Sequence, residues 1–199
     1  MPKKAQSARS VMPEARDWNA MREQGARLLL QRTGRSEEDW NQRIAARAFS
    51  GPDDLAAWLQ AEGVTGYART HLIRERFGWP DFLTASADAL IAGQYADRPA
   101  LRPIFERLIA AALAVGDVSV QARKTYVSLV TPRRTFARIQ ATTRTRVDLA
   151  LRLEGRAPQG RLVASKIHES CPLHISFTDP AEVDAEVLDC VRLAYNENS

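Results

Sequence analysis

Hydrophobic and polar residues alternate with a period of two along residues 123–153, a pattern that is typical of β-strands. The clearest run is 146–153, in which four aliphatic residues alternate with charged or small ones. The strands predicted from this alternation span residues 119–122, 125–130, 135–141, 146–153, 161–166 and 173–177. They predict an antiparallel sheet of about five or six strands with one apolar face and one basic face.

The first half of the chain shows helical spacing instead. Helices are predicted over residues 13–32, 65–77 and 81–95. Two further helices begin after Ser36 and Ser50, whose hydroxyl groups can cap the first turn. Residues 13–97 therefore predict a helical domain, preceded by a tail at 1–12 that we expect to be disordered.

The second half combines helices with the predicted sheet. A helix over residues 99–115 precedes the strands, and a last helix follows Thr178-Asp179-Pro180. Helices on both sides of a run of antiparallel strands predict an α+β domain, with the helices packed on the apolar face. We expect this domain to span residues 98–199, with the boundary between the domains at Asp97-Arg98-Pro99.

The chain has 199 residues and a net charge of +4, and this charge is unevenly distributed. Residues 117–179 carry 11 basic and 5 acidic residues, whereas the first 97 residues are balanced. A basic sheet can attract anions, although a solvated basic face needs no ligand. The charge distribution indicates either an anionic partner for the predicted sheet or a face that only keeps it soluble.

Export, membrane insertion and disulfide formation are not indicated by this sequence. The basic start of the chain is not followed by an apolar run, and no stretch approaches the length of a membrane span. Cys171 and Cys190 are too few for a disulfide framework. We therefore expect a cytoplasmic protein, bacterial in type, with two reduced thiols, no membrane contact and an unknown oligomeric state.

No catalytic, cofactor or metal motif is recognised. The chain has no phosphate-binding glycine loop, no His-Glu-x-x-His and no nucleophile elbow. His168 and His174 flank Cys171, but a metal site would need further ligands, so we expect Cys171 to be a buried apolar residue. Asp148 is expected to form a surface ion pair with Arg146 or Arg152.

One group of residues forms a candidate binding site. Arginine side chains suit phosphate or carboxylate groups, and an aromatic ring beside them could stack on a base. If the strands are neighbours in matching register, the residues that gather on one face of the sheet are Lys124, Tyr126, Arg138, Arg146 and Arg152. The alternative is that Tyr126 belongs to the core and the arginines are solvated.

Parts of the sequence resemble two uncharacterised families. The strings TGRSEEDWNQRI and AAWLQAEGVTGYA resemble a small helical domain of unknown function found in bacterial proteins. The strings LRPIFERLI, RKTYVSL, RTFARIQATTRTRVDLALRL and TDPAEVDAEVL resemble a second domain of unknown function, labelled in places "predicted transport protein". The resemblance implies no established reaction, cofactor or catalytic residue.

Three functional hypotheses follow from these patterns. The first is a non-catalytic accessory protein that binds an anionic partner, nucleic acid or another polyanion, through the basic sheet. The second is a small-molecule-binding or enzymatic α+β domain with a pocket around Tyr126, Phe136 and His174. The third is a protein-protein interaction module, for which the tryptophans of the helical half supply candidate surfaces.

Overall fold

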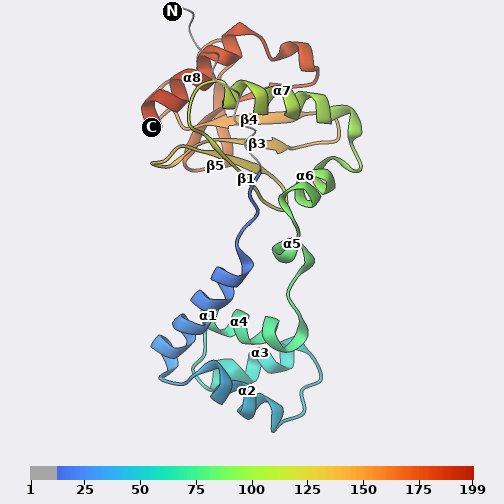
Figure 1. Ribbon diagram of the computed structural model, residues 1–199, viewed down its shortest axis with the longest axis vertical. Coiled ribbons are helices and arrows are strands. Elements are labelled where there is room, and N and C mark those ends of the chain that lie inside the picture. The colour runs from blue at the N-terminus through green and yellow to red at the C-terminus, as the bar shows by residue number, and fades with distance from the viewer. Residues whose placement is uncertain (1–12) are drawn as a thin grey trace, which may run out of the picture. The chain divides into compact units, whose positions relative to one another are not determined.

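The computed structural model describes residues 13–199, which fall into two compact units (Figure 1). One unit is helical and comprises residues 16–85. The other comprises residues 13–15 and 86–199, and we call it the α+β unit. The predicted tail at residues 1–12 lies outside the described residues.

The helical unit is built from short helices, which are α1 (Trp18–Thr33), α2 (Glu37–Ala45), α3 (Pro52–Ala61), α4 (Gly66–Phe77) and α5 (Asp81–Thr84). Of these, α1 and α2 begin with a side-chain cap, from Asp17 and Ser36. The cap predicted at Ser50 is wrong, because Gly51 is the N-cap of α3 and no side chain bonds to its first turn. Ser36 caps α2, as the sequence predicts, and Asp39 completes a reciprocal capping box by accepting a hydrogen bond from the Ser36 backbone. Gly34, at a φ of 69°, ends α1 in the left-handed conformation that glycine adopts without strain.

The core of the helical unit is formed where α1, α2, α3 and α4 meet. Its fully or almost fully buried side chains are Leu29, Trp40, Ile44, Leu55, Leu59, Val64, Ala68 and Leu72. Two predicted helices differ from the structure. The first begins at Trp18, after the cap Asp17, and not at Pro13; the predicted helix over 81–95 is broken because Ser86 caps a new helix.

The α+β unit contains six strands and the remaining helices. Its helices are α6 (Ala87–Tyr95), the 3-10 turn η1 (Pro99–Leu101), α7 (Arg102–Leu113), η2 (Pro180–Glu182) and α8 (Ala185–Asn198). Its strands are β1 (Ser119–Ala122), β2 (Val127–Val130), β3 (Thr135–Ala141), β4 (Val147–Leu151), β5 (Val163–His168) and β6 (Cys171–Phe177). The predicted α+β fold is confirmed.

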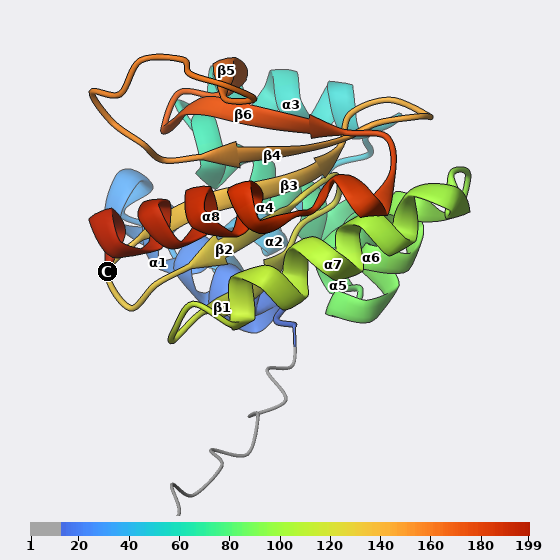
Figure 2. The same ribbon diagram turned by 90° about the horizontal axis from the view of Figure 1, so that it is seen from above.

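The strands form one antiparallel sheet in the order β1-β2-β3-β4-β6-β5. Helices α7 and α8 lie side by side across one face of this sheet (Figures 1 and 2). The opposite face is called the open face below. In the central strands, Ile139, Leu149 and Ile175 lie in one row and are at most 1% exposed. Phe136 is fully buried and contacts the ring of Tyr195 on α8.

The α+β unit begins earlier in the sequence than the predicted boundary at residues 97 and 98. Helix α6 belongs to this unit because the side-chain amide of Gln94 donates hydrogen bonds to the carbonyl groups of Arg123 and Tyr126, at 2.7 and 3.3 Å. Glu14 also belongs to it, since its backbone bonds to Val120 and Ala122 along the edge of β1. These contacts connect residues far apart in the sequence.

No helix within residues 13–199 combines the length and the apolar character needed to cross a bilayer.

Candidate functional site

Two rows of side chains cross the open face of the sheet. In the first row, Arg138 on β3 is opposite Ser128 and Ala150, and Ala150 is opposite His174 on β6. Directly opposite residues share a face of the sheet. Ala150 is fully buried, and only its short methyl group lies between the longer side chains of Arg138 and His174. With strands about 4.8 Å apart, the Cα atoms of Arg138 and His174 are about 10 Å apart.

The second row contains Gln140, Asp148 and Ser176. Asp148 is only 1% exposed although it is charged. Its Oδ1 accepts a hydrogen bond from the Ser176 hydroxyl at 2.7 Å and lies 3.1 Å from Nε of Arg146. This confirms the predicted pair between Asp148 and Arg146, but the carboxylate is buried, not on the surface. A buried carboxylate needs such partners because desolvation disfavours its charged form.

A bulge in the edge strand β5 closes the side of this second row. Ala164 pairs with Leu173 and His168 pairs with Cys171, so three residues of β5 face the single residue Pro172. Proline has no N–H to donate, and the ladder is interrupted at this position. The bulge brings Lys166 and Ile167 beside His174.

Together these side chains line a depression of about 490 Å³, which we call the basin. The residues that line the basin are Gln140, Thr142, Arg146, Asp148, Ala164, Lys166, Ile167 and His174. Its volume falls in the range of small-molecule sites, which is about 300–1,000 Å³. Lys166 is exposed at the rim and has no ion-pair partner among residues 13–199.

Buried nitrogen atoms without a hydrogen-bond partner gather at this face. Within residues 13–199, eight buried side-chain nitrogen or oxygen atoms lack a partner. Three of these eight are Nε of Arg138, Nε of Arg146 and Nδ1 of His174. The contact between Arg146 and Asp148 is thus a close ion pair without hydrogen-bond alignment. Because unpaired buried polar groups are rare in native proteins, such a concentration marks a candidate functional site.

The structure brings together only part of the predicted site. The guanidinium group of Arg138 covers the ring of Tyr126, with its carbon 4.8 Å from the ring centroid. Arg146 lies on the same face, at the basin. Lys124 is exposed in the turn between β1 and β2. Arg152 follows β4 at the other end of the strand, where its Nε donates a hydrogen bond to the Ser170 carbonyl at 3.0 Å.

The three residues expected to surround one pocket in the second hypothesis are separated by the sheet. Phe136 packs against Tyr195 in the core, and the Tyr126 ring is covered by Arg138, whereas His174 lines the basin. Sequence reasoning did not group His174 with Asp148 and Lys166. The register of β4, β6 and the bulged β5 brings them together, and only the odd placement of Pro172 within a strand pattern could have indicated the bulge.

His168, Cys171 and His174, which are close in sequence but were not predicted to form a metal site, have separate roles in the structure. Nδ1 of His168 is 2.8 Å from the Ser170 hydroxyl. Cys171 is fully buried, and this burial raises the pKa of its thiol. Both cysteines are free thiols. Within residues 13–199, these three side chains do not form a cluster with metal-binding spacing.

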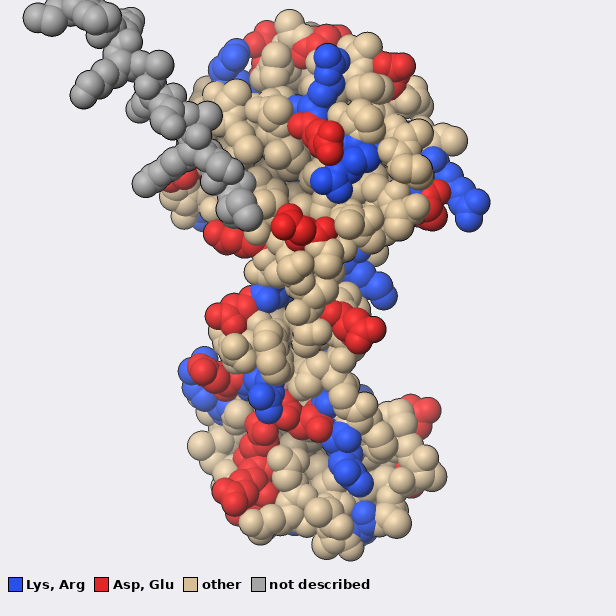
Figure 3. Space-filling model, turned by 45° about the vertical axis from the view of Figure 1, so that its right-hand side comes forward, with Lys and Arg blue, Asp and Glu red and all other residues tan. Residues whose placement is uncertain are grey.

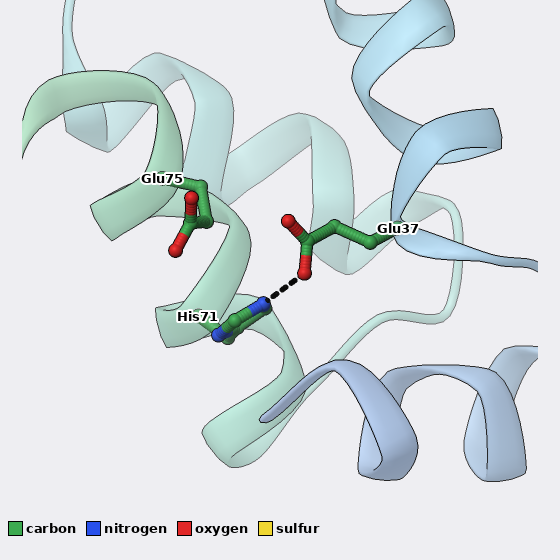
Figure 4. A group of neighbouring side chains, drawn as sticks. All are labelled: Glu37, His71 and Glu75. Carbon is green, nitrogen blue, oxygen red and sulfur yellow. Dashed lines mark hydrogen bonds and ion pairs between the residues drawn. The ribbon is translucent and has the colours of Figure 1, made fainter. Parts of the chain in front are cut away.

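A different cluster in the helical unit has such spacing. Glu37, His71 and Glu75 place one ligand atom each within 4.8 Å of one another (Figure 4). Nε2 of His71 is 2.7 Å from the Glu37 carboxylate, and Glu75 follows His71 by one turn of α4. His71 is fully buried.

The contacts of this cluster favour a structural role. Both oxygens of Glu75 accept hydrogen bonds from Arg22, at 2.5 and 2.6 Å, and one also accepts a hydrogen bond from Trp79. Nδ1 of His71 has no partner, whereas a metal-binding imidazole almost always donates its second N–H to an acceptor. The cluster therefore joins α1, α2 and α4 as a network of ion pairs and hydrogen bonds.

The face shown in Figure 3 carries interspersed basic and acidic side chains on both units. No broad surface of one charge sign covers it. The basin is distinguished by the buried nitrogen atoms of Arg146 and His174 that make no hydrogen bond.

Comparison with known proteins gives one family match. A family described as "Domain of unknown function (DUF5655)" matches residues 88–198, which begin in α6 and end in α8. No curated protein and no solved structure matches the chain. The match agrees with the second resemblance seen in the sequence; the first resemblance and the transport label stay predictions. Since the match covers more than half of the chain, the protein belongs to the DUF5655 family.

Proposed function

We propose that the α+β unit is a binding module for an anionic partner, which it holds at the basin and along the adjoining row of Arg138. The observation that carries the proposal is the set of buried nitrogen atoms on Arg138, Arg146 and His174 that make no hydrogen bond, although Arg146 forms an ion pair with Asp148. An anion can neutralise the cationic groups and align them, which is the role that arginine and lysine commonly have at phosphate and carboxylate sites.

The size of the basin supports a small anion more strongly than an extended polyanion. Nucleic acid, the partner expected from the charge of the sequence, would need basic residues along a path that follows its phosphates. The basin is instead one depression of about 490 Å³ with Lys166 at its rim. Nucleic acid stays within the proposal as a partner to be tested.

A titration of the full chain would test the proposal. Binding of inorganic phosphate is followed by the amide chemical shifts of β3, β4 and β6. Binding of labelled single-stranded and duplex oligonucleotides is followed by fluorescence anisotropy at low and near-physiological salt. We expect phosphate to shift amides around Lys166 and His174. Oligonucleotide binding that weakens steeply with salt would extend the proposal to nucleic acid.

Two matched double variants distinguish binding at the proposed site from a general effect of the protein's positive charge. The double variant Arg138→Gln, Lys166→Gln is expected to weaken binding by about tenfold or more. The control Arg102→Gln, Arg192→Gln removes the same charge from exposed ion pairs on α7 and α8. Equal losses in the two double variants, or no shift with any of the anions, would refute the proposed site.

A further inference from the structure

The basin contains an acceptor as well as cations. Oδ1 of Asp148 accepts the hydrogen bond from Ser176 and is near Arg146, but Oδ2 makes no hydrogen bond with any of residues 13–199. Asp148 nevertheless lines the basin. Oδ2 is not among the buried atoms that lack a partner, so solvent reaches it, and a ligand in the basin can replace this water by donating a hydrogen bond to Oδ2.

The carboxylate and amide groups of the basin lie on different strands from the Lys166 and His174 nitrogen groups. Asp148 and Gln140 lie opposite each other on β4 and β3, and offer a carboxylate and an amide. Lys166 on the bulge of β5 and His174 on β6 offer nitrogen donors. A ligand that fills the basin therefore meets nitrogen donors at β5 and β6. At β3 and β4 it meets the Asp148 carboxylate beside Arg146, and the Gln140 amide, which can both donate and accept.

A simple anion would use only part of this site. The carboxylate of Asp148 repels a second negative group at close range, so the part of the ligand that contacts it must donate hydrogen bonds. Hydroxyl groups meet this requirement, and the cavity volume of about 490 Å³ leaves room for several carbon atoms beside a phosphate group.

We infer that the basin binds a small phosphorylated polyol, such as a sugar phosphate, with its phosphate at Lys166 and His174 and its hydroxyl groups at Asp148 and Gln140. The inference rests on the proposed anion-binding function and specifies its ligand. In this arrangement inorganic phosphate still binds at Lys166 and His174, but Asp148 favours phosphates that carry neighbouring hydroxyl groups, because a site built to accept hydrogen bonds loses them when the donor is missing.

Calorimetric titration of the full chain tests the inference with defined probes. Ribose 5-phosphate, glucose 6-phosphate and glycerol 3-phosphate are each compared with inorganic phosphate and with the unphosphorylated sugar or glycerol. We expect at least one phosphorylated compound to bind about tenfold or more tightly than inorganic phosphate, because its hydroxyl groups add hydrogen bonds to a charged acceptor. The unphosphorylated compounds should bind more weakly than their phosphates.

The variant Asp148→Asn isolates the selecting group. It keeps the size of the side chain and removes its charge, so we expect binding of inorganic phosphate to persist and the preference for the phosphorylated polyols to fall by about tenfold. Gln121→Glu, which changes charge on β1 outside the basin lining, is the control and should leave the preference unchanged.

The outcomes distinguish the inference from the proposed function. Phosphate binding with equal affinity for all phosphorylated probes, or an unchanged preference in Asp148→Asn, would overturn the inference and leave the anion site in place. No binding of any probe would overturn both. If Asp148→Asn does not fold, the ratio of affinities measured with the natural chain decides the question alone.

Discussion

The imidazole of His71 lies directly against the backbone of Gly25. A Cβ atom placed on Gly25 would come within 2.3 Å of Nδ1 of His71, and within 2.9 Å of two ring carbons. Both residues are buried between α1 and α4. The absence of a side chain at Gly25 thus allows these two helices to approach closely around the histidine.

Substitution of Gly25 is therefore expected to destabilise the helical unit. Gly25→Ala should lower its free energy of unfolding by about 1–3 kcal/mol, because the added methyl group overlaps a buried ring that cannot move freely. All four tryptophans, Trp18, Trp40, Trp58 and Trp79, lie in this unit. Urea unfolding followed by tryptophan fluorescence thus reports on it directly.

Two further variants test whether the overlap with His71 causes the loss of stability in Gly25→Ala. Gly51→Ser places a side chain at the start of α3, where an added Cβ meets no atom within 4 Å, so its effect should stay within a few tenths of a kcal/mol. The double variant Gly25→Ala, His71→Ala should lose less stability than the two single changes added together. Strict additivity would show that the clash with His71 is not the cause.

The ion pair between Arg22 and Glu75 predicts a pH dependence of the helical unit. Burial raises the pKa of Glu75, but hydrogen bonds from Arg22 and Trp79 outweigh burial and hold this pKa below its ordinary value. The ionised carboxylate therefore stabilises the folded unit above the pKa of the unfolded chain. This stability is lost as pH falls through the lower, folded pKa.

Glu75→Gln is expected to remove this dependence. The natural chain should lose stability between about pH 5 and pH 3, and the variant should change less over that range while being less stable at neutral pH. The midpoint of urea unfolding, measured by tryptophan fluorescence at each pH, checks the expectation. Glu23→Gln removes an exposed carboxyl on α1 and serves as the control. Parallel pH profiles for all three chains would contradict the assignment.

The two thiols are expected to react at different rates. Burial raises the pKa of both Cys171 and Cys190, which keeps them protonated and poorly nucleophilic at neutral pH. Cys171 is fully buried, whereas Cys190 is only partly buried on α8. Iodoacetamide should therefore label Cys190 first in the folded chain, and both thiols at similar rates in denaturant. Mass spectrometry of the labelled peptides would reveal a reversed order, which would contradict the burial of Cys171.

Gln94 is expected to hold the turn that carries Tyr126. Gln94→Ala removes two hydrogen bonds to the carbonyl groups of Arg123 and Tyr126, and should cost about 1–3 kcal/mol. Hydrogen exchange of the Arg123 amide, which donates to the Tyr126 carbonyl, should become faster. Asp88→Asn changes an exposed residue of the same helix and should leave this exchange rate unaltered.

Local patterns were sufficient to predict much of the fold. The strand at residues 135–141 and the cap at Ser36 depend on neighbours in sequence, and both appear in the structure. The strict alternation breaks at Phe136 and Ala137, which are both buried where the register against β2 shifts. The break between α5 and α6 was missed because Ser86 was treated as a residue inside a helix and not as a cap. Apolar periodicity alone does not distinguish one helix from two that follow closely.

The candidate site was less predictable because it depends on strand register. The sequence puts Arg138 and Arg146 on one face only if their strands are neighbours in matching register. The association of Asp148, His174 and Lys166 further requires the order β4-β6-β5 and the bulge opposite Pro172. A shift of register by one residue would move each side chain to the other face of the sheet. Sequence spacing within single strands carries no information about such pairing.

The backbone contacts of Glu14 with β1 have a consequence for how the protein is assembled from its chain. Because residues 13–15 complete the edge of a sheet whose strands begin at Ser119, the helical unit is an insertion within the α+β unit. During synthesis, the helical unit can fold as soon as residues 16–85 are made, whereas Glu14 must wait for β1 to appear. The α+β unit therefore cannot complete this edge until the whole insertion and β1 have been synthesised.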